Sequence, residues 1–199
     1  MPPAEGQQRI EWAKQHMPVL HRLLDERLRD GALAGRKVAV VVHLEAKTAC
    51  LVLALQEAGA QVVAAGSNPL STQDVVCDAL RELGVEVHAR HGASADEFTA
   101  DLLRVAESGA ELVIDDGLEL TRRLAEHRPD LYANLQGVSE ETTTGVARLR
   151  ALEADGLLPY PAIAANDAKC KHLFDNPYGT GETALTAILA LTNVLAAGR

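Results

Sequence analysis

Short apolar runs alternate along the chain with segments in which apolar residues recur at helical spacing. Runs rich in small and β-branched apolar residues, typical of buried strands, cover 37–42, 61–65, 85–89, 112–114 and 160–164. Helical spacing covers 10–29, with a break at Pro18, and then 48–58, 72–83, 95–107, 118–127, 143–155 and 182–197. This alternation of strands and helices predicts an α/β fold with a parallel sheet.

The predicted architecture is a single three-layer domain of the Rossmann-like or flavodoxin-like type. We expect a parallel sheet of about five strands with helices on both faces. No internal repeat, low-complexity tract or linker-like stretch divides the sequence, so residues 1–199 are interpreted as one domain. In such sheets, ligands bind beyond the carboxyl ends of the strands. Polar residues that directly follow the apolar runs are therefore the first candidates for a functional site.

Composition removes several classes of function. The net charge is -9 and no block of Lys or Arg is present, so we expect no nucleic-acid partner, because phosphate binding needs a basic surface. No apolar run has the length of a membrane span, and the N-terminus lacks a signal pattern. We therefore expect a cytoplasmic protein without a membrane partner. Cys50 and Cys77 fall on apolar helix faces and are expected to be buried, and neither disulfides nor a metal site is expected.

Five polar blocks lie beside the apolar runs. They read H-L-E-A-K-T-A (43–49), S-N-P-L-S-T-Q-D (67–74), I-D-D-G (114–117), S-E-E-T-T-T-G (139–145) and N-D-A-K-C-K-H-L-F-D-N-P-Y-G-T-G (166–181). A strand buried on both faces has no use for such residues. Because the carboxyl ends of parallel strands lie at one edge of a sheet, the blocks together predict one polar pocket.

The pair Asp115 and Asp116 ends a predicted buried strand. A carboxylate beside Val113 and Ile114 needs hydrogen-bond donors or a proton, which suits a general base. The same pattern also fits a helix N-cap, since Gly117 and a predicted helix follow. From spacing alone, the two interpretations have about equal weight.

The other polar blocks also have ordinary structural interpretations. A histidine at a strand end, such as His43, is more often a capping or packing residue than a catalyst. The acids and threonines at 140–144 are typical of a helix start. Lys171 and Asp175 are four residues apart and could form an ion pair on a helix surface. Residues 179–184 are interpreted as a turn into the last helix, because no apolar strand precedes them.

Taken in order, the five blocks resemble the substrate-binding half of S-adenosylhomocysteine hydrolase (adenosylhomocysteinase). H-L-E-A-K-T-A and Y-G-T-G are most similar to the archaeal and thermophile type of that family, and the resemblance runs from about Gly6 to Arg199. It implies a substrate-binding domain over 1–199 and an absent NAD-binding domain. NAD would then be held mainly by a domain or partner subunit outside this stretch.

The resemblance also implies roles for individual residues. The implied catalytic residues, which would transfer protons at the sugar, are His43, Asp116 and Lys171. The implied substrate-binding residues, at the purine side and the ribose, are Glu45, Lys47, Glu141 and Asp175. The implied cofactor contacts are Thr142, Thr143, Thr144 and Asn176. Asp115 is expected to have a structural task.

The implied reaction is hydrolysis of S-adenosylhomocysteine, or of a related purine nucleoside, to nucleoside and homocysteine. It would proceed by NAD-dependent oxidation at the ribose 3' position, elimination across C4' and C5', and addition of water. We expect the stretch alone to be inactive. One alternative is a nucleoside-pathway enzyme that carries out the same elimination and hydration on another 5'-substituted nucleoside. Another is a catalytically silent nucleoside-binding module. The purine (adenine or hypoxanthine), the 5'-group and self-association stay open.

Overall fold

The computed structural model describes residues 4–29 and 31–198. Within them lies one six-stranded sheet with the order β3-β2-β1-β4-β5-β6. Its strands are β1 (Lys37–Val42), β2 (Gln61–Gly66), β3 (Glu86–Val87), β4 (Leu112–Asp115), β5 (Gly137–Glu140) and β6 (Ala162–Ala164). All of these pairings are parallel, which confirms the predicted α/β fold class.

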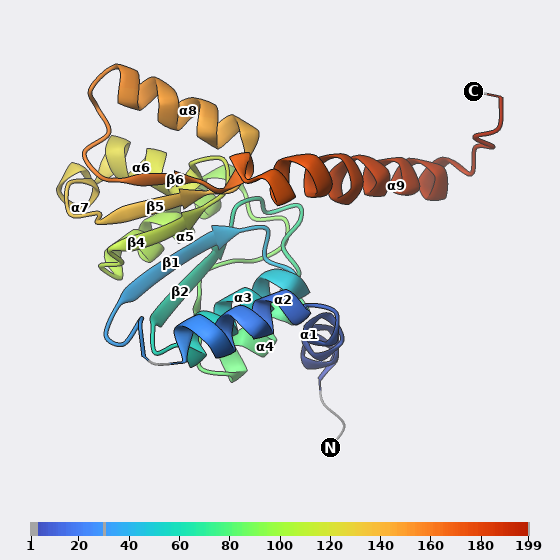
Figure 1. Cartoon of the computed structure of the whole chain (residues 1–199), viewed down its shortest axis with the longest axis horizontal. Coiled ribbons are helices and arrows are strands. Elements are labelled where there is room, and N and C mark those ends of the chain that lie inside the picture. Colours follow the sequence, from blue (N-terminus) through green and yellow to red (C-terminus); the bar gives the residue numbers. More distant parts are fainter. Residues whose placement is uncertain (1–3, 30, 199) are drawn as a thin grey trace.

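Helices cover the sheet on both sides (Figure 1). In the described residues they are α1 (Glu5–Gln15), α2 (Pro18–Leu23), α3 (Ala46–Glu57), α4 (Asp74–Glu82), α5 (Ala95–Glu107), α6 (Glu119–His127), α7 (Pro129–Tyr132), α8 (Thr143–Ala154) and α9 (Thr183–Thr192). The remaining helical segments are η1 (Leu24–Leu28), η2 (Ala165–Asp167) and η3 (Lys171–Glu182). None of the helices found in 4–29 and 31–198 is long and apolar enough to cross a membrane.

Strand β1 lies at the centre of the sheet, and its side chains alternate between two cores. Val38 and Val40 pack with buried residues of α1, α3 and α4. Ala39 and Val41 pack on the opposite face with buried residues of α5 and α6. This burial on both faces explains the uninterrupted apolar run of β1 and establishes the three layers. Cys50 and Cys77 are buried in the first core, as predicted.

The sheet has six strands where the sequence predicted about five. The additional strand is β5 (Gly137–Glu140), which pairs with β4 and β6. Only Val138 is apolar in its sequence G-V-S-E, so no apolar run revealed the strand. The predicted helix start at the acidic pair shifts accordingly, because Glu140 ends the strand and α8 begins at Thr143.

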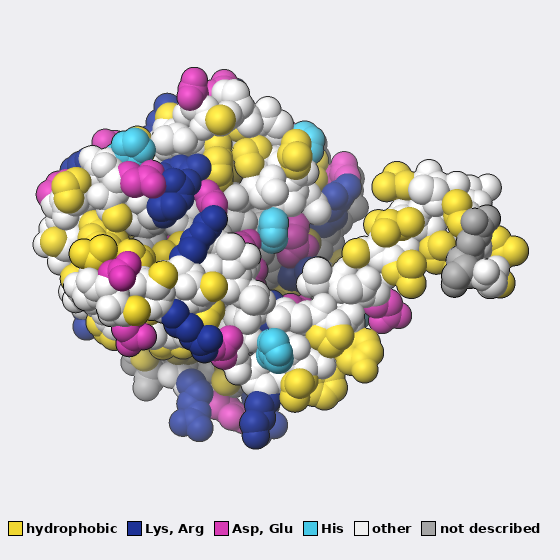
Figure 2. Space-filling model, turned by 90° about the horizontal axis from the view of Figure 1, so that it is seen from above, with side chains coloured by type: hydrophobic (Ala, Val, Ile, Leu, Met, Phe, Trp, Pro, Cys, Tyr) yellow, Lys and Arg dark blue, Asp and Glu magenta, His cyan; other side chains and the backbone are white. Residues whose placement is uncertain are grey.

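The C-terminal segment also departs from the prediction. Residues 179–184 form no turn, because η3 runs directly into α9 and the helical winding continues to Thr192. The Thr186 hydroxyl donates to the Glu182 carbonyl at 3.0 Å, a bond to the preceding turn that accompanies this winding. The helix ends at Asn193, whose φ is 53°, short of the predicted end at residue 197. Figure 1 shows α9 pointing away from the body, and Figure 2 shows hydrophobic side chains along this projecting segment.

The strand order creates a topological switch point between β1 and β4. The chain passes from β1 outward through β2 to β3 and then returns to β4 on the other side of β1. Ligands of open α/β sheets bind outside the carboxyl ends of the strands at such a point. His43 directly follows β1 and Asp116 directly follows β4, so these two residues flank it.

Candidate functional site

A histidine and an aspartate meet at the switch point. His43 Nε2 lies 3.4 Å from Asp116 Oδ2, and the Ser67 hydroxyl donates to the same oxygen at 2.7 Å. The Asp116 side chain is 8% exposed, whereas the His43 side chain is 49% exposed. A buried acid held in place beside an accessible imidazole can pass a proton to or from a bound ligand.

Glu141 adds a second carboxyl group to this cluster. Its backbone N–H donates to the Asp115 carbonyl at 3.2 Å, which continues the pairing of β4 and β5. Burial raises the pKa of the Glu141 carboxyl, and the Asp116 charge raises it further. The charges of Lys171 and His43 oppose this increase in pKa. Glu141 therefore lies within electrostatic reach of every residue implied in proton transfer.

Lys171 enters the cluster from the start of η3. Its Nζ donates to Asn176 Oδ1 at 2.7 Å and lies 3.0 Å from Asp175 Oδ2. The wider winding of η3, with hydrogen bonds from i to i+5, places residues four and five positions ahead beside Lys171. Asn176 in turn donates to Asn166 Oδ1 at 3.1 Å. These contacts tie η3 to the carboxyl end of β6.

Glu140 is a structural acid beside the accessible one. It is completely buried, and its carboxylate accepts from the backbone N–H groups of Gly117 (2.9 Å), Leu118 (2.9 Å) and Thr142 (2.8 Å). The Thr142 hydroxyl donates to it at 2.7 Å and also accepts from the Gly145 N–H at 3.0 Å as the cap of α8. A carboxylate suits four donors, so Glu140 joins the turn after β4 to the start of α8.

Asp115 has the structural task expected of it. It accepts from the N–H groups of Asp116 (3.0 Å), Leu120 (3.2 Å) and Thr121 (2.9 Å) and from the Thr121 hydroxyl (2.6 Å). Burial raises the pKa of Asp115 to about 6, although these donors favour the charged form. Asp115 thus caps the first turn of α6, as the helix-cap interpretation requires, while Asp116 contacts His43 and Ser67 instead. The general-base role of Asp116 stays a prediction.

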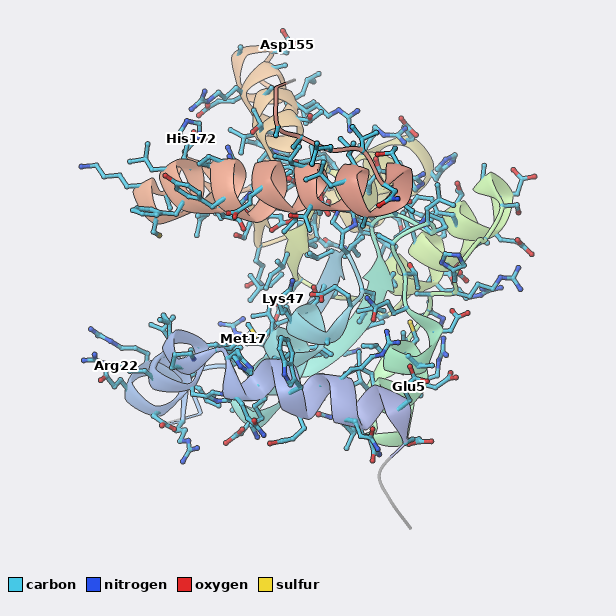
Figure 3. The ribbon with its side chains drawn as sticks, turned by 90° about the vertical axis from the view of Figure 1, so that its right-hand side faces the viewer. Glu5, Met17, Arg22, Lys47, Asp155 and His172 are labelled. Carbon is cyan, nitrogen blue, oxygen red and sulfur yellow. The ribbon has the colours of Figure 1, made fainter. Side chains whose placement is uncertain are left out.

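The residues assigned to the purine side open helix α3. The Glu45 carboxylate accepts from the N–H groups of Lys47 (3.0 Å) and Thr48 (3.1 Å) and caps the helix. The Lys47 ammonium lies 3.7 Å from Glu45 Oε2, and the Lys47 side chain is 70% exposed. Figure 3 shows Lys47 on the side of the molecule between the η3–α9 helix and α1. Oε1 of Glu45 is committed to the helix and Oε2 faces Lys47, whose more exposed side chain is the more accessible of the two to a ligand.

The remaining predicted residues lie at the start of α8. Thr143 and Thr144 are exposed, and the Thr143 hydroxyl is 3.5 Å from Asn166 Oδ1. The Thr142 hydroxyl is occupied by Glu140 and by the helix cap. Across the part of the chain that the structure describes, no group of three or more His, Cys, Asp or Glu side chains could hold a metal ion.

Two serines of the block at 67–74 belong to the site but were not among the predicted site residues. Ser67 bonds to Asp116, and Ser71 Oγ lies 2.6 Å from His43 Nδ1. The available signal was their position after β2, the neighbour of β1. Seen from above, the surface is hollowed where the projecting helix meets the body, with charged and histidine side chains around the hollow (Figure 2).

Comparison with known sequences identifies the relationship. The sequence profile described as S-adenosyl-L-homocysteine hydrolase matches residues 3–130 and 122–196. The chain belongs to this family. This confirms the resemblance carried by the five polar blocks.

Individual relatives match almost the whole chain. Adenosylhomocysteinase of Thermotoga maritima is 47% identical over 194 residues, which are 98% of this chain and 48% of that protein. S-inosyl-L-homocysteine hydrolase of Methanocaldococcus jannaschii is 45% identical over 195 residues, 98% of this chain and 47% of that protein. Adenosylhomocysteinase of Aeropyrum pernix is 48% identical over 195 residues, 98% of this chain and 47% of that protein. The chain therefore spans about half the length of the curated relatives it matches.

Similarity to a solved structure is weaker. CurA from Vibrio vulnificus, in complex with NADPH, covers 89% of this chain and 52% of that chain, with a TM-score of 0.42 and 14% identity. A likeness of this size carries no argument about function.

Proposed function

We propose that this chain is the nucleoside-binding half of an adenosylhomocysteinase-like hydrolase. The cluster of His43, Asp116, Glu141, Lys171 and Asp175 at the carboxyl edge of the sheet carries the proposal. It combines acids, an imidazole and an amine within reach of one another, as proton transfers on a polyhydroxylated sugar require. A silent binding module has no need of a buried acid held beside an accessible histidine.

Lys171 is the group proposed to act at the ribose 3'-hydroxyl. Asp175 and Asn176 hold its amine at 3.0 Å and 2.7 Å, so a bound ribose would meet it in a fixed position. An uncharged lysine amine can accept the hydroxyl proton. The carboxylates of Glu141 and Asp175 are acceptors that suit the ribose hydroxyl groups.

Asp116 is the group proposed to take the proton from C4'. Its carboxylate is buried, accepts the Ser67 hydroxyl and faces His43 Nε2. A proton that reaches Asp116 can therefore pass to the accessible imidazole of His43. That imidazole is placed to exchange it with the leaving group or with water at C5'.

The residues at the start of α8 suit the nicotinamide end of NAD. The exposed Thr143 and Thr144 hydroxyls and the Asn176 amide can hydrogen-bond a carboxamide, while Thr142 is committed to Glu140. Within residues 4–29 and 31–198, no strand is followed by the glycine-rich turn that cradles a pyrophosphate. A second domain or subunit would therefore hold most of the cofactor. When bound, NAD would supply the oxidation at the ribose 3' carbon.

The exposed Lys47 side chain favours S-inosyl-L-homocysteine as a second candidate substrate. With the purine at the start of α3, the exposed Lys47 side chain offers ammonium donors, whereas Oε1 of Glu45 caps the helix and Oε2 faces Lys47. Adenine presents a donor group at C6, and a C6 oxygen such as that of hypoxanthine is an acceptor. The accessible Lys47 ammonium at this edge therefore suits the C6 oxygen of hypoxanthine.

Calorimetric titration of the purified chain with adenosine, inosine and NAD separately tests the proposal. We expect a purine nucleoside to bind. Glu141→Gln should lower the affinity for that nucleoside by about tenfold or more, the size of a lost hydrogen bond to a charged group. Glu153→Gln, which alters an exposed glutamate in α8, is the matched control and should bind like the wild type. The absence of nucleoside binding, or binding that is indifferent to Glu141→Gln, would contradict the proposal.

A further inference from the structure

The loop after β2 is organised by its own polar groups. Asn68 Oδ1 accepts from the Leu70 N–H at 2.9 Å. The Asn68 carbonyl accepts from the Ser71 N–H (3.2 Å), the Ser71 hydroxyl (3.0 Å) and the Thr72 hydroxyl (3.1 Å). Gly66 provides the space, since a Cβ at that position would collide with the Thr72 hydroxyl. Ser71 is therefore held in place by the fold itself.

The hydrogen bonds of Ser71 favour one of the two neutral tautomers of His43. A serine hydroxyl has one hydrogen, and Ser71 donates it to the Asn68 carbonyl, which can only accept. Ser71 Oγ also lies 2.6 Å from His43 Nδ1, and while the Ser71 hydrogen points to Asn68 this second contact takes its hydrogen from the imidazole. Neutral His43 then carries its hydrogen on Nδ1 and a lone pair on Nε2.

The lone pair of Nε2 faces an oxygen that is also an acceptor. Asp116 Oδ2 lies 3.4 Å from His43 Nε2 and accepts the Ser67 hydroxyl. Two facing acceptors repel each other unless a proton lies between them. The separation is longer than the roughly 2.8 Å of a charge-assisted hydrogen bond, so the pair can tighten when it gains that proton.

We propose that Ser71 is a positioning residue that selects the Nδ1–H tautomer of His43 and so makes His43 Nε2 and Asp116 Oδ2 a one-proton relay. Ser67 positions the other half of the relay by holding Asp116. Glu141, Lys171 and Asp175 are the other charged groups of this cluster, and the Thr48 hydroxyl donates to the His43 backbone carbonyl at 2.6 Å. The use of the relay in a reaction rests on the proposed function, whereas the tautomer is a property of the chain alone.

Nitrogen-15 NMR of the histidine side chains tests the inference, because it shows which ring nitrogen carries hydrogen. In a pH titration of the whole chain, we expect His43 Nδ1 to stay protonated and Nε2 alone to change. Ser71→Ala should shift the tautomer ratio of neutral His43 toward Nε2–H by about tenfold, the size of one net hydrogen bond. Ser71→Thr, which keeps the hydroxyl, should preserve the wild-type ratio.

The matched control is Ser108→Ala. The Ser108 hydroxyl also donates to the carbonyl three residues earlier, that of Val105 at 2.6 Å, but it lies beside Lys37 at the opposite edge of the sheet. This variant should leave the His43 signals unchanged.

Two results would overturn the inference. One is neutral wild-type His43 with its hydrogen on Nε2, and the other is an unchanged tautomer ratio in a folded Ser71→Ala. The wild-type titration decides the matter even where Ser71→Ala fails to fold. The spectra need neither ligand nor turnover, so nucleoside binding with the wrong tautomer refutes the relay alone. The correct tautomer without nucleoside binding refutes the proposed function alone.

Discussion

Replacing Glu140 with glutamine tests whether the first acid of the pair at 140–141 is a folding residue. Its buried carboxylate accepts from Gly117, Leu118 and twice from Thr142. Glutamine has almost the same shape, but one of its two terminal groups is a donor. The best orientation keeps the oxygen toward Gly117 and Thr142 and turns the NH2 group against the Leu118 N–H.

The size of the effect follows from this mismatch. One hydrogen bond to a charged group, worth roughly 1.5–3 kcal/mol, is lost, and a buried donor is left without an acceptor. Because glutamine is neutral, the variant avoids the cost of burying a charged carboxylate, and this offsets part of the loss. We therefore expect the free energy of unfolding to fall by about 2–3 kcal/mol. In a domain of this size each kcal/mol corresponds to about 2–4 °C, so the melting temperature should fall by about 4–12 °C.

The assay is urea unfolding followed by far-ultraviolet circular dichroism at neutral pH, with Glu141→Gln as the matched control. The two variants make the same chemical change at neighbouring positions. Burial and the Asp116 charge disfavour the ionised form of Glu141, so its neutral replacement should not lower stability. A Glu140→Gln variant with the wild-type midpoint, or one no less stable than Glu141→Gln, would refute the assigned roles.

Two further predictions concern the same region. Gly145→Ala should lower the free energy of unfolding by about 1–3 kcal/mol in the same assay, because a Cβ there would collide with the Glu140 carboxylate; unchanged stability would show that the contact can relax. The raised pKa of Glu141 means that the folded chain holds this proton more tightly than the unfolded chain does. The stabilisation that this proton provides is complete below pH 4.5, the ordinary pKa of a glutamate carboxyl. It is lost as the pH rises through the higher pKa of the folded state. Glu141→Gln should therefore gain stability relative to the wild type between about pH 4 and pH 7, measured by urea unfolding at both values; a constant difference would contradict this reasoning.

The contrast between α5 and β5 shows how far the sequence predicts the fold. Helix α5 has the predicted bounds, Ala95–Glu107, and Ser94 and Glu97 form a capping box at its start. Its local signals and its final structure agree. Strand β5 has Val138 as its only apolar residue, and it owes its strand conformation to pairing with β4 and β6. Such long-range pairing leaves little trace in the local pattern of residues.

The two acidic pairs show what the sequence can and cannot decide about the site. In each pair, the last residue of a strand, Asp115 or Glu140, is buried against backbone donors of the following turn. The next residue, Asp116 or Glu141, reaches the cluster around His43 because consecutive side chains at a strand end point to opposite sides. The location of the cluster could be predicted from the strand ends. The choice within each pair came from the resemblance, because the spacing alone treats both residues alike.

The contact between His43 and Ser71 lay beyond sequence reasoning. The two residues are 28 positions apart and meet only because β1 and β2 are neighbours whose following loops turn toward each other. The block at 67–74 marked a polar loop at the correct edge of the sheet. Which of its side chains would touch His43 depended on the internal hydrogen bonds of that loop.

Backbone amide NMR of the chain during addition of inosine or adenosine locates the nucleoside site directly. We predict that the signals that move belong to residues after β1, β4 and β5 and to η3, including His43, Asp116, Glu141 and Lys171. Lys37 at the opposite end of β1 should be unaffected. Unchanged spectra at saturating nucleoside, or changes centred away from the switch point, would contradict the claim that this edge of the sheet is a nucleoside site.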